Sequence, residues 1–136
     1  MAANLTGGCG CGAVRFEIGG ELGQALYCHC TRCQRRSGTA ASASVRVAPG
    51  SVAVTAGAEH VRAWAPPDGR EKAFCQACGS ALFVRSPGSQ EIVAVRLGAI
   101  DGDPVVRPSA RQFVAYAARW EPIPDDGLPR HEERMP

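Results

Sequence analysis

The stretch GGCGCG, residues 7–12, places two cysteines one residue apart in a run of glycines. A second stretch of the same kind, CQACGS at residues 75–80, holds another close pair of cysteines. Glycine lets the backbone turn so that amide groups face the sulfurs, and each turn can then present two thiolates on one side. Two such turns brought together complete the tetrahedral four-thiolate set of structural zinc. We therefore predict a structural zinc site with four ligands: Cys9, Cys11, Cys75 and Cys78.

All seven cysteines of the 136-residue chain stand in clusters. An odd count excludes a framework made of disulfides alone, and the thiols of a cytosolic protein stay reduced. Buried structural cysteines would be scattered singly, so the clustering favours metal binding. A structural zinc can contribute about 10 kcal/mol or more of folding free energy, which is a large share for a chain of this length.

A third stretch, YCHCTRCQRRSG at residues 27–38, carries the remaining three cysteines. Three protein ligands and one open position are the arrangement of catalytic zinc, whose fourth ligand is water or a substrate atom. We predict that Cys28, Cys30 and Cys33 bind a second zinc of this kind, to which an incoming thiol could be added. The chain would then bind two Zn²⁺ ions, and the second site could be only partly occupied.

Three arginines stand close to this second site, at positions 32, 35 and 36. Three thiolates and one Zn²⁺ leave the site with one net negative charge, and a fourth thiolate would leave two. Arginine side chains can offset this charge, and they can hold carboxylates through paired hydrogen bonds. We predict that Arg35 and Arg36 bind the substrate, while a merely solvated face remains the alternative for them.

Other assignments of the cysteines are open. The first pair could join Cys28 and Cys30, which leaves a different group of three: Cys33, Cys75 and Cys78. The close spacing within residues 28–33 instead favours one unit that chelates a single metal. The second zinc could also be structural, with water or His29 as its fourth ligand. Because adjacent positions on an extended strand point apart, we expect His29 to face solvent or the substrate.

Short alternating patterns predict an all-β chain with almost no helix. The expected strands lie at 13–18, 25–28, 41–47, 51–55, 59–65, 72–75, 81–85, 91–97 and 112–120. One helical turn is expected at 31–37, with Thr31 as its cap. We predict a single zinc-binding domain over residues 1–136, with a core from about 5 to 129 and a polar C-terminal tail that frays or follows the surface. Five aromatic residues are expected in the core or in a pocket wall: Trp64, Phe74, Phe83, Phe113 and Trp120.

Charge and hydropathy exclude several classes of protein. A net charge of +2 with 21% charged residues gives no strong field for nucleic acid or a membrane surface. No run approaches the ~20 apolar residues that span a bilayer, and the first ten residues lack the pattern of a secretory signal. We expect a cytoplasmic protein without membrane or nucleic-acid partners. A zinc-binding adaptor, or a carrier of a thiol adduct without catalytic turnover, is the alternative to an enzyme.

The three cysteine stretches, in this order and spacing, resemble those of a known family. The sequences GGCGCGAVRFE, YCHCTRCQRRSG and FCQACGSALF are similar to those of glutathione-dependent formaldehyde-activating enzymes, which include centromere protein V-like proteins. The resemblance runs from about Leu5 to about Pro129. It implies a β-tent of small antiparallel sheets held by a Cys₄ zinc site, and a second, more labile zinc on the middle stretch.

The resemblance also implies an activity and roles for individual residues. The activity is the addition of glutathione, a thiol, to the aldehyde formaldehyde to give S-hydroxymethylglutathione, a carbon–sulfur lyase reaction. Cys9, Cys11, Cys75 and Cys78 match the structural ligands, and Cys28, Cys30 and Cys33 match the ligands of the active zinc. The chain departs from the family pattern at Arg111, where members often carry a histidine, and in its compact loops. These departures concern the substrate and not the fold.

Overall fold

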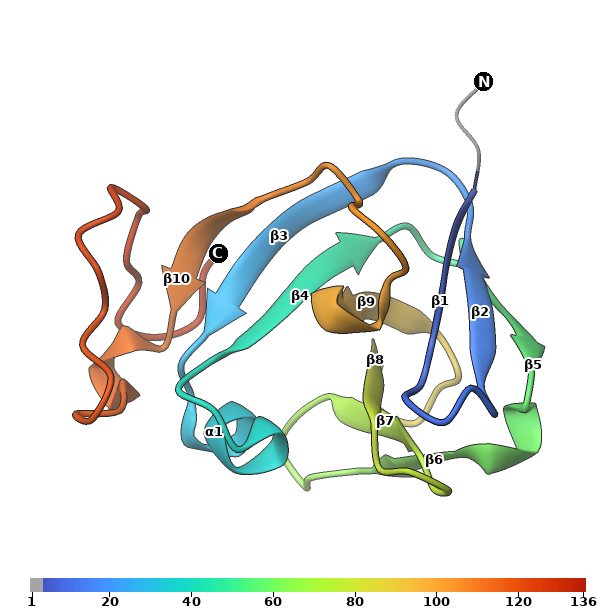
Figure 1. Cartoon of the computed structure of the whole chain (residues 1–136). Coiled ribbons are helices and arrows are strands. Elements are labelled where there is room, and N and C mark those ends of the chain that lie inside the picture. Colours follow the sequence, from blue (N-terminus) through green and yellow to red (C-terminus); the bar gives the residue numbers. More distant parts are fainter. Residues whose placement is uncertain (1–3) are drawn as a thin grey trace. The chain divides into compact units, whose positions relative to one another are not determined.

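The computed structural model describes residues 4–136, and strands account for most of its regular structure (Figure 1). The predicted all-β class with small antiparallel sheets is confirmed. The chain divides into two compact units: residues up to Gly23 with Val45–Val105, and Gln24–Ser44 with Val106–Pro136. The single zinc-binding domain stays a prediction. Within the part of the chain that is described, no helix has the length and apolar character needed to cross a membrane.

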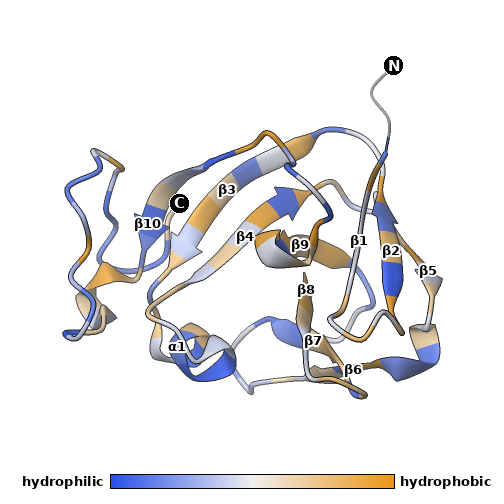
Figure 2. Ribbon diagram, viewed as in Figure 1, coloured by the Kyte–Doolittle hydropathy of each residue, from blue (hydrophilic) through white to orange (hydrophobic). Residues whose placement is uncertain are grey.

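Antiparallel strands build the first unit. Three of them pair in the order β1 (Leu5–Gly8), β2 (Arg15–Ile18) and β5 (Val52–Ala56). Four more pair in the order β9 (Ile92–Arg96), β8 (Ala81–Arg85), β7 (Glu71–Cys75) and β6 (Val61–Trp64). Phe16 and Phe83 are buried and meet edge to face with ring centroids 5.0 Å apart, which packs β2 against β8. Figure 2 shows β9 mostly in hydrophobic colours, as expected for a strand in this core.

The second unit contains a parallel strand pair and one short helix. β3 (Leu22–Cys28) runs parallel to β10 (Pro108–Gln112), with Tyr27 opposite Arg111 and Cys28 opposite Gln112. The helix α1 (Thr31–Ser37) follows β3 and ends at Gly38, which adopts a left-handed conformation with φ 69°. β4 (Ser42–Val47) follows, and from Val45 onward the chain belongs to the first unit.

The expected strand at 112–120 is wrong. β10 lies earlier, at Pro108–Gln112, and a 3₁₀ turn follows at Val114–Tyr116. Phe113 stands between them with φ 57°, a left-handed conformation that cannot continue a strand. The apolar alternation that predicts a strand here therefore belongs to a turn. Thr31 as helix cap is also wrong, because Cys30 is the cap of α1.

The aromatic expectations divide between the phenylalanines and the tryptophans. Phe83 is buried, and Phe74 and Phe113 are partly buried, as expected for core or wall positions. Trp64 is 42% exposed and Trp120 is 67% exposed, so the expectation is wrong for both. Trp64 lies on β6, which ends the order of the first unit's second group of strands, where only one side of a strand is paired.

The polar C-terminal segment does not fray. It returns beside β10 and the turn that follows (red in Figure 1). The backbone N–H of Arg111 donates to Pro129 at 2.9 Å, and the N–H of His131 donates back to Arg111 at 2.9 Å. Near its end Met135 is buried against the apolar cluster of the second unit. Backbone hydrogen bonds, which a polar composition does not reveal, fix this segment.

Candidate functional site

Four cysteine sulfurs come together in the first unit. The Sγ atoms of Cys9, Cys11, Cys75 and Cys78 all lie within 4.8 Å of one another. The Sγ atoms of Cys9 and Cys11 are 3.6 Å apart. A tetrahedral metal with metal–sulfur bonds of about 2.3 Å separates its sulfurs by about 3.8 Å. The donor set and its spacing therefore fit a metal ion, while the ligand roles themselves remain predictions.

Two tight turns present these sulfurs. In the first, the N–H of Gly12 donates to the carbonyl of Cys9 at 3.2 Å; in the second, the N–H of Gly79 donates to the carbonyl of Cys75 at 2.7 Å. Both glycines adopt φ 80°, the left-handed region that side chains disfavour. A Cβ at either position would meet no atom within 4 Å, so backbone conformation and not space selects glycine.

Hydrogen bonds to sulfur and oxygen join the two turns. Ser80 accepts from the N–H of Gly10 at 2.9 Å, and its Oγ lies 3.2 Å from the Sγ of Cys78. The N–H of Val14 donates to the Sγ of Cys9 at 3.2 Å. The chain thus supplies donors aimed at the sulfurs, which stabilise their thiolate forms.

The four thiols differ in acidity. The hydrogen bond from Ser80 lowers the pKa of Cys78 to about 5. The backbone of Ala13 lowers the pKa of Cys11, but the sulfurs of Cys9 and Cys78 outweigh it, and the pKa rises to about 11. Sulfurs this close cannot all be thiolates unless a cation is bound between them. A divalent metal would supply that charge.

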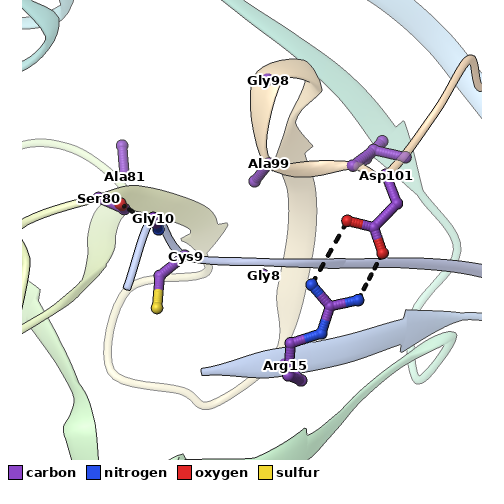
Figure 3. A pocket seen from close by; sticks show the side chains of 10 residues that line it. Gly8, Cys9, Gly10, Arg15, Ser80, Ala81, Gly98, Ala99 and Asp101 are labelled. Atoms are coloured by element: carbon purple, nitrogen blue, oxygen red, sulfur yellow. Dashed lines mark hydrogen bonds and ion pairs between the residues drawn. The ribbon is translucent and has the colours of Figure 1, made fainter. Parts of the chain in front are cut away.

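A hollow of about 420 Å³ lies beside this cluster (Figure 3). Cys9, Ser80, Arg15 and Asp101 are among its lining residues, and Arg15 forms an ion pair with Asp101. Thr6 also donates to Asp101 at 2.7 Å, and Arg15, then Thr6, hold the pKa of that carboxyl below its usual value. Because these two charges neutralise each other, the pair leaves little attraction for a charged substrate. The hollow is therefore poorly suited to binding a charged molecule.

Three cysteine sulfurs form a separate cluster in the second unit. The Sγ atoms of Cys28, Cys30 and Cys33 lie within 4.8 Å of one another, and Cys28 and Cys33 are buried. Cys30 is partly exposed. Among residues 4–136, no histidine, cysteine, aspartate or glutamate adds a fourth donor to this group. The cluster could hold a metal ion with one position open to an external ligand.

The join between β3 and α1 gathers these three sulfurs. Residues two apart on an extended segment point to the same side, so Cys28 and Cys30 share a side while His29 points away. Cys30 then caps α1: its Sγ accepts from the N–H of Cys33 at 3.3 Å, and its carbonyl accepts from the N–H of Gln34 at 3.0 Å. The first helical turn thus returns Cys33 to the two cysteines that precede it.

Charge repulsion and burial make this cluster dependent on a cation. The sulfurs of Cys30 and Cys33, together with burial, raise the pKa of Cys28 far above its usual value. Three thiolates in this space therefore require a compensating positive charge. A divalent metal would provide it, which is the same requirement as at the four-cysteine cluster.

The expectation that His29 faces solvent is wrong. His29 is only 3% exposed, and its Nε2 lies 3.1 Å from Nη1 of Arg111. Because arginine can only donate, Nε2 accepts and the ring proton resides on Nδ1. Burial, and then the charge of Arg111, lower the pKa of His29, so the ring is neutral. His29 is therefore not the fourth donor of the cluster.

Arg111 contacts separate segments of the second unit, and these contacts could not be predicted from the sequence. Its guanidinium donates to one oxygen of Asp126, from Nη2 at 2.7 Å and from Nε at 3.3 Å. It also lies 4.4 Å from the ring centroid of Tyr27. The hydrogen bond from Arg111, followed by the one from the N–H of Leu128, holds the pKa of Asp126 below its usual value. The parallel register of β3 and β10, which brings Tyr27 opposite Arg111, could not be read from the chain.

The two predicted substrate arginines lie on the last turn of α1. Arg35 is exposed and Arg36 is partly buried. The helix that carries them is drawn largely in hydrophilic colours in Figure 2. The same helix carries Cys33, which places both arginines within a turn of one cysteine of the three-cysteine cluster. Their role in substrate binding stays a prediction.

The fold and its two cysteine clusters define a small all-β protein that could bind two metal ions. The family model described as glutathione-dependent formaldehyde-activating enzyme matches residues 4–116, and the chain belongs to this family. The family expected from the three cysteine stretches is thereby confirmed.

Two known proteins are similar to the chain. One, from Halomonas elongata, is named "Putative glutathione-dependent formaldehyde-activating enzyme". It is 35% identical over 113 residues, which cover 79% of this chain and 71% of that protein. The other is a crystal structure of a Rhodobacter sphaeroides protein, a structural-genomics target. It is 29% identical with a TM-score of 0.54, covering 74% of this chain and 92% of that one.

Proposed function

We propose that the chain is a zinc-dependent enzyme that joins glutathione to a small aldehyde such as formaldehyde, a reaction of the carbon–sulfur lyase class. The observation that carries the proposal is the three-sulfur cluster, which is one donor short of a tetrahedron in a chain of this family. Cys28, Cys30 and Cys33 would hold the active zinc. The four-cysteine cluster would hold the structural zinc through Cys9, Cys11, Cys75 and Cys78.

Zinc held by three thiolates would supply an open fourth position and the positive charge that lowers the pKa of a thiol. The chain's own residues prepare the surroundings of that position. Cys28 and Cys33 are buried and shield one side from water, while the partly exposed Cys30 marks the side that solvent can reach. The amide of Gln34 donates to the carbonyl of His29 at 2.8 Å and to the carbonyl of Tyr116 at 2.9 Å, which fixes the segment between Cys28 and Cys30.

The reaction is an addition with no change of oxidation state. A bond forms between the glutathione sulfur and the aldehyde carbon, while the π bond of the carbonyl breaks. The thiol releases its proton, and the former carbonyl oxygen takes up one proton to become a hydroxyl. No oxidant or reductant is required, and one molecule of S-hydroxymethylglutathione results.

Arg35 and Arg36 would hold the carboxylates of the tripeptide. Guanidinium groups pair with carboxylates through charge-assisted hydrogen bonds, and two of them match a ligand that carries two carboxylates. Their position on α1 keeps them close to Cys33 without burying their charge fully. The reduced thiols that the proposal needs are maintained in a compartment such as the cytoplasm.

The rate of adduct formation tests this proposal. Exchange between free glutathione and S-hydroxymethylglutathione can be followed by NMR at fixed formaldehyde, with and without the protein. The zinc-loaded protein should accelerate the exchange in proportion to its concentration, and Cys30→Ser should abolish the acceleration. Adduct that binds in equal molar amount to the protein without any acceleration would reject the enzyme and favour a carrier.

A further inference from the structure

Arg111 is a charged residue that the second unit buries and surrounds with partners. It is 8% exposed although it carries a permanent positive charge. Burying such a group is unfavourable unless it is fully paired, so its contacts indicate what it does. Its partners are the ring of His29, the carboxylate of Asp126 and the face of the Tyr27 ring.

The contact with His29 reaches the three-cysteine cluster directly. His29 is the residue between Cys28 and Cys30, so fixing its ring fixes the backbone that carries two of the three sulfurs. The N–H of His29 also donates to the carbonyl of Gln112 at 3.0 Å. Both tethers of His29 therefore lead to neighbouring residues of β10, Arg111 and Gln112.

The contact with Asp126 reaches the same cluster from another direction. Asp126 begins the C-terminal segment, whose Met135 is buried with Cys28 and Cys33 in one apolar cluster. The N–H of Met135 donates to Oε1 of Gln112 at 3.1 Å, which ties the end of the segment to β10. The segment that Arg111 holds thus places one apolar side chain, Met135, against two of the three cysteines, and we call this contact the C-terminal wall.

We infer that Arg111 is a positioning residue for the metal at the three-cysteine cluster, because it holds both the His29 hinge between two ligands and the C-terminal wall against them. The inference rests on the proposed function only in that a metal binds there. Groups that fix the ligands of a metal from outside its coordination sphere commonly change its affinity by about 10- to 100-fold. Arg111 should act on this cluster and not on the four-cysteine cluster, which lies in the first unit.

Competition with a zinc chelator on the fully loaded protein tests the inference. Arg111→Gln should weaken zinc binding at the three-cysteine cluster by about 10-fold or more and leave the four-cysteine cluster unchanged. Arg111→Lys should fall between this variant and the wild type, because one ammonium group cannot reach both His29 and Asp126 as the guanidinium does. The ratio of the two affinities within one molecule separates positioning from a general loss of stability.

Two further variants complete the experiment. Asp126→Asn keeps the contact between Arg111 and His29 while loosening the C-terminal wall, so it should weaken the same cluster by a smaller factor and serves if Arg111→Gln does not fold. Arg85→Gln is the matched control, because Arg85 pairs with Glu71 at 3.2 Å in a comparably shielded ion pair of the first unit. It should leave the three-cysteine cluster unchanged.

Two outcomes would overturn the inference. One is an equal loss of affinity at both clusters in Arg111→Gln. The other is a loss at the three-cysteine cluster no larger than that of Arg85→Gln. Neither measurement involves glutathione or aldehyde, so a protein that fails to make the adduct but shows the cluster-specific loss would reject the proposed function and retain the positioning role.

Discussion

The two cysteine clusters draw their sulfurs from the chain in different ways. The four-cysteine cluster draws its sulfurs from two turns far apart in the sequence, so a metal there ties distant parts of the first unit together. The three-cysteine cluster draws all its sulfurs from residues 28–33. A metal there would link only residues that are already close in the sequence. A metal site that links distant residues stabilises the fold. A local site that lacks one donor is instead suited to binding an external ligand.

The surroundings of the two clusters differ in the same sense. Around the four cysteines the donors to sulfur come from residues that closely follow each turn, as in the hydrogen bond from the N–H of Val14 to Cys9. Around the three cysteines, the contacts that fix the backbone come from His29, Gln34 and the C-terminal wall. This arrangement leaves Cys30 partly exposed, as the proposed binding of a substrate thiol would require.

The largest expected contrast is between cysteine substitutions in the two clusters. Cys9→Ser or Cys78→Ser should yield unfolded or insoluble protein, because a structural zinc contributes about 10 kcal/mol of folding free energy. Cys30→Ser should remain folded and melt close to the wild type, since the chain does not depend on that metal. Circular dichroism on heating measures both. Equal losses for all three variants would show that the local cluster is structural as well.

A chelator should separate the clusters without any mutation. A mild chelator should remove about one zinc per chain while the fold persists, and the other zinc should leave only when the protein unfolds. Metal release and circular dichroism recorded on the same sample provide the measurement. Loss of both metals together with the fold would mean that the two clusters are not different in kind.

The arginines of α1 should distinguish between thiols. Replacing both Arg35 and Arg36 by alanine should weaken glutathione binding by about three- to tenfold, as expected for partly exposed ion pairs. Binding of mercaptoethanol, which has no carboxylate, should hardly change. Arg46→Ala, an exposed arginine on β4, is the matched control. Equal weakening of both thiols would remove carboxylate pairing as their role.

The ion pair beside the four-cysteine cluster should have the smallest effect. Arg15 and Thr6 hold the pKa of Asp101 below its usual value in the folded state. Between the lowered and the usual pKa, the unfolded chain therefore binds more protons than the folded one. The stabilisation by the ion pair is complete above the usual carboxyl pKa and is lost as the pH falls through the lowered pKa. Urea unfolding of the wild type and Asp101→Asn should differ slightly at pH 6, and the difference should shrink as the pH falls below the usual carboxyl pKa. A difference that persists at low pH would contradict the pairing.

Cysteine spacing made much of the candidate site predictable, because ligands that are close in sequence or flanked by glycine leave a local pattern. The division into groups of four and three follows from the stretches around Cys9, Cys30 and Cys75, and the structure gathers the sulfurs in those groups. Strand positions were predictable where apolar and polar residues alternate, as in β2. The strand pattern failed after Gln112, where Phe113 takes a left-handed conformation that no periodicity reveals.

The support behind the three-cysteine cluster was not predictable. A histidine between two cysteines looks like a spacer, yet the ring of His29 is buried and contacts Arg111, which lies on β10. The polar C-terminal segment looks like a fraying tail, although Asp126 and Met135 fix it against β10. Each of these features depends on a pairing between distant residues, for which one sequence contains no local signal.

Zinc-edge X-ray absorption tests the contrast between the clusters most directly. Protein loaded with two zinc ions should show a mean of about 3.5 sulfur neighbours per zinc, because one site has four protein sulfurs and the other has three. Saturating glutathione should raise this mean to about 4, as its sulfur completes the three-cysteine site. A mean of about 4 before glutathione is added, or a mean that glutathione does not change, would contradict the account.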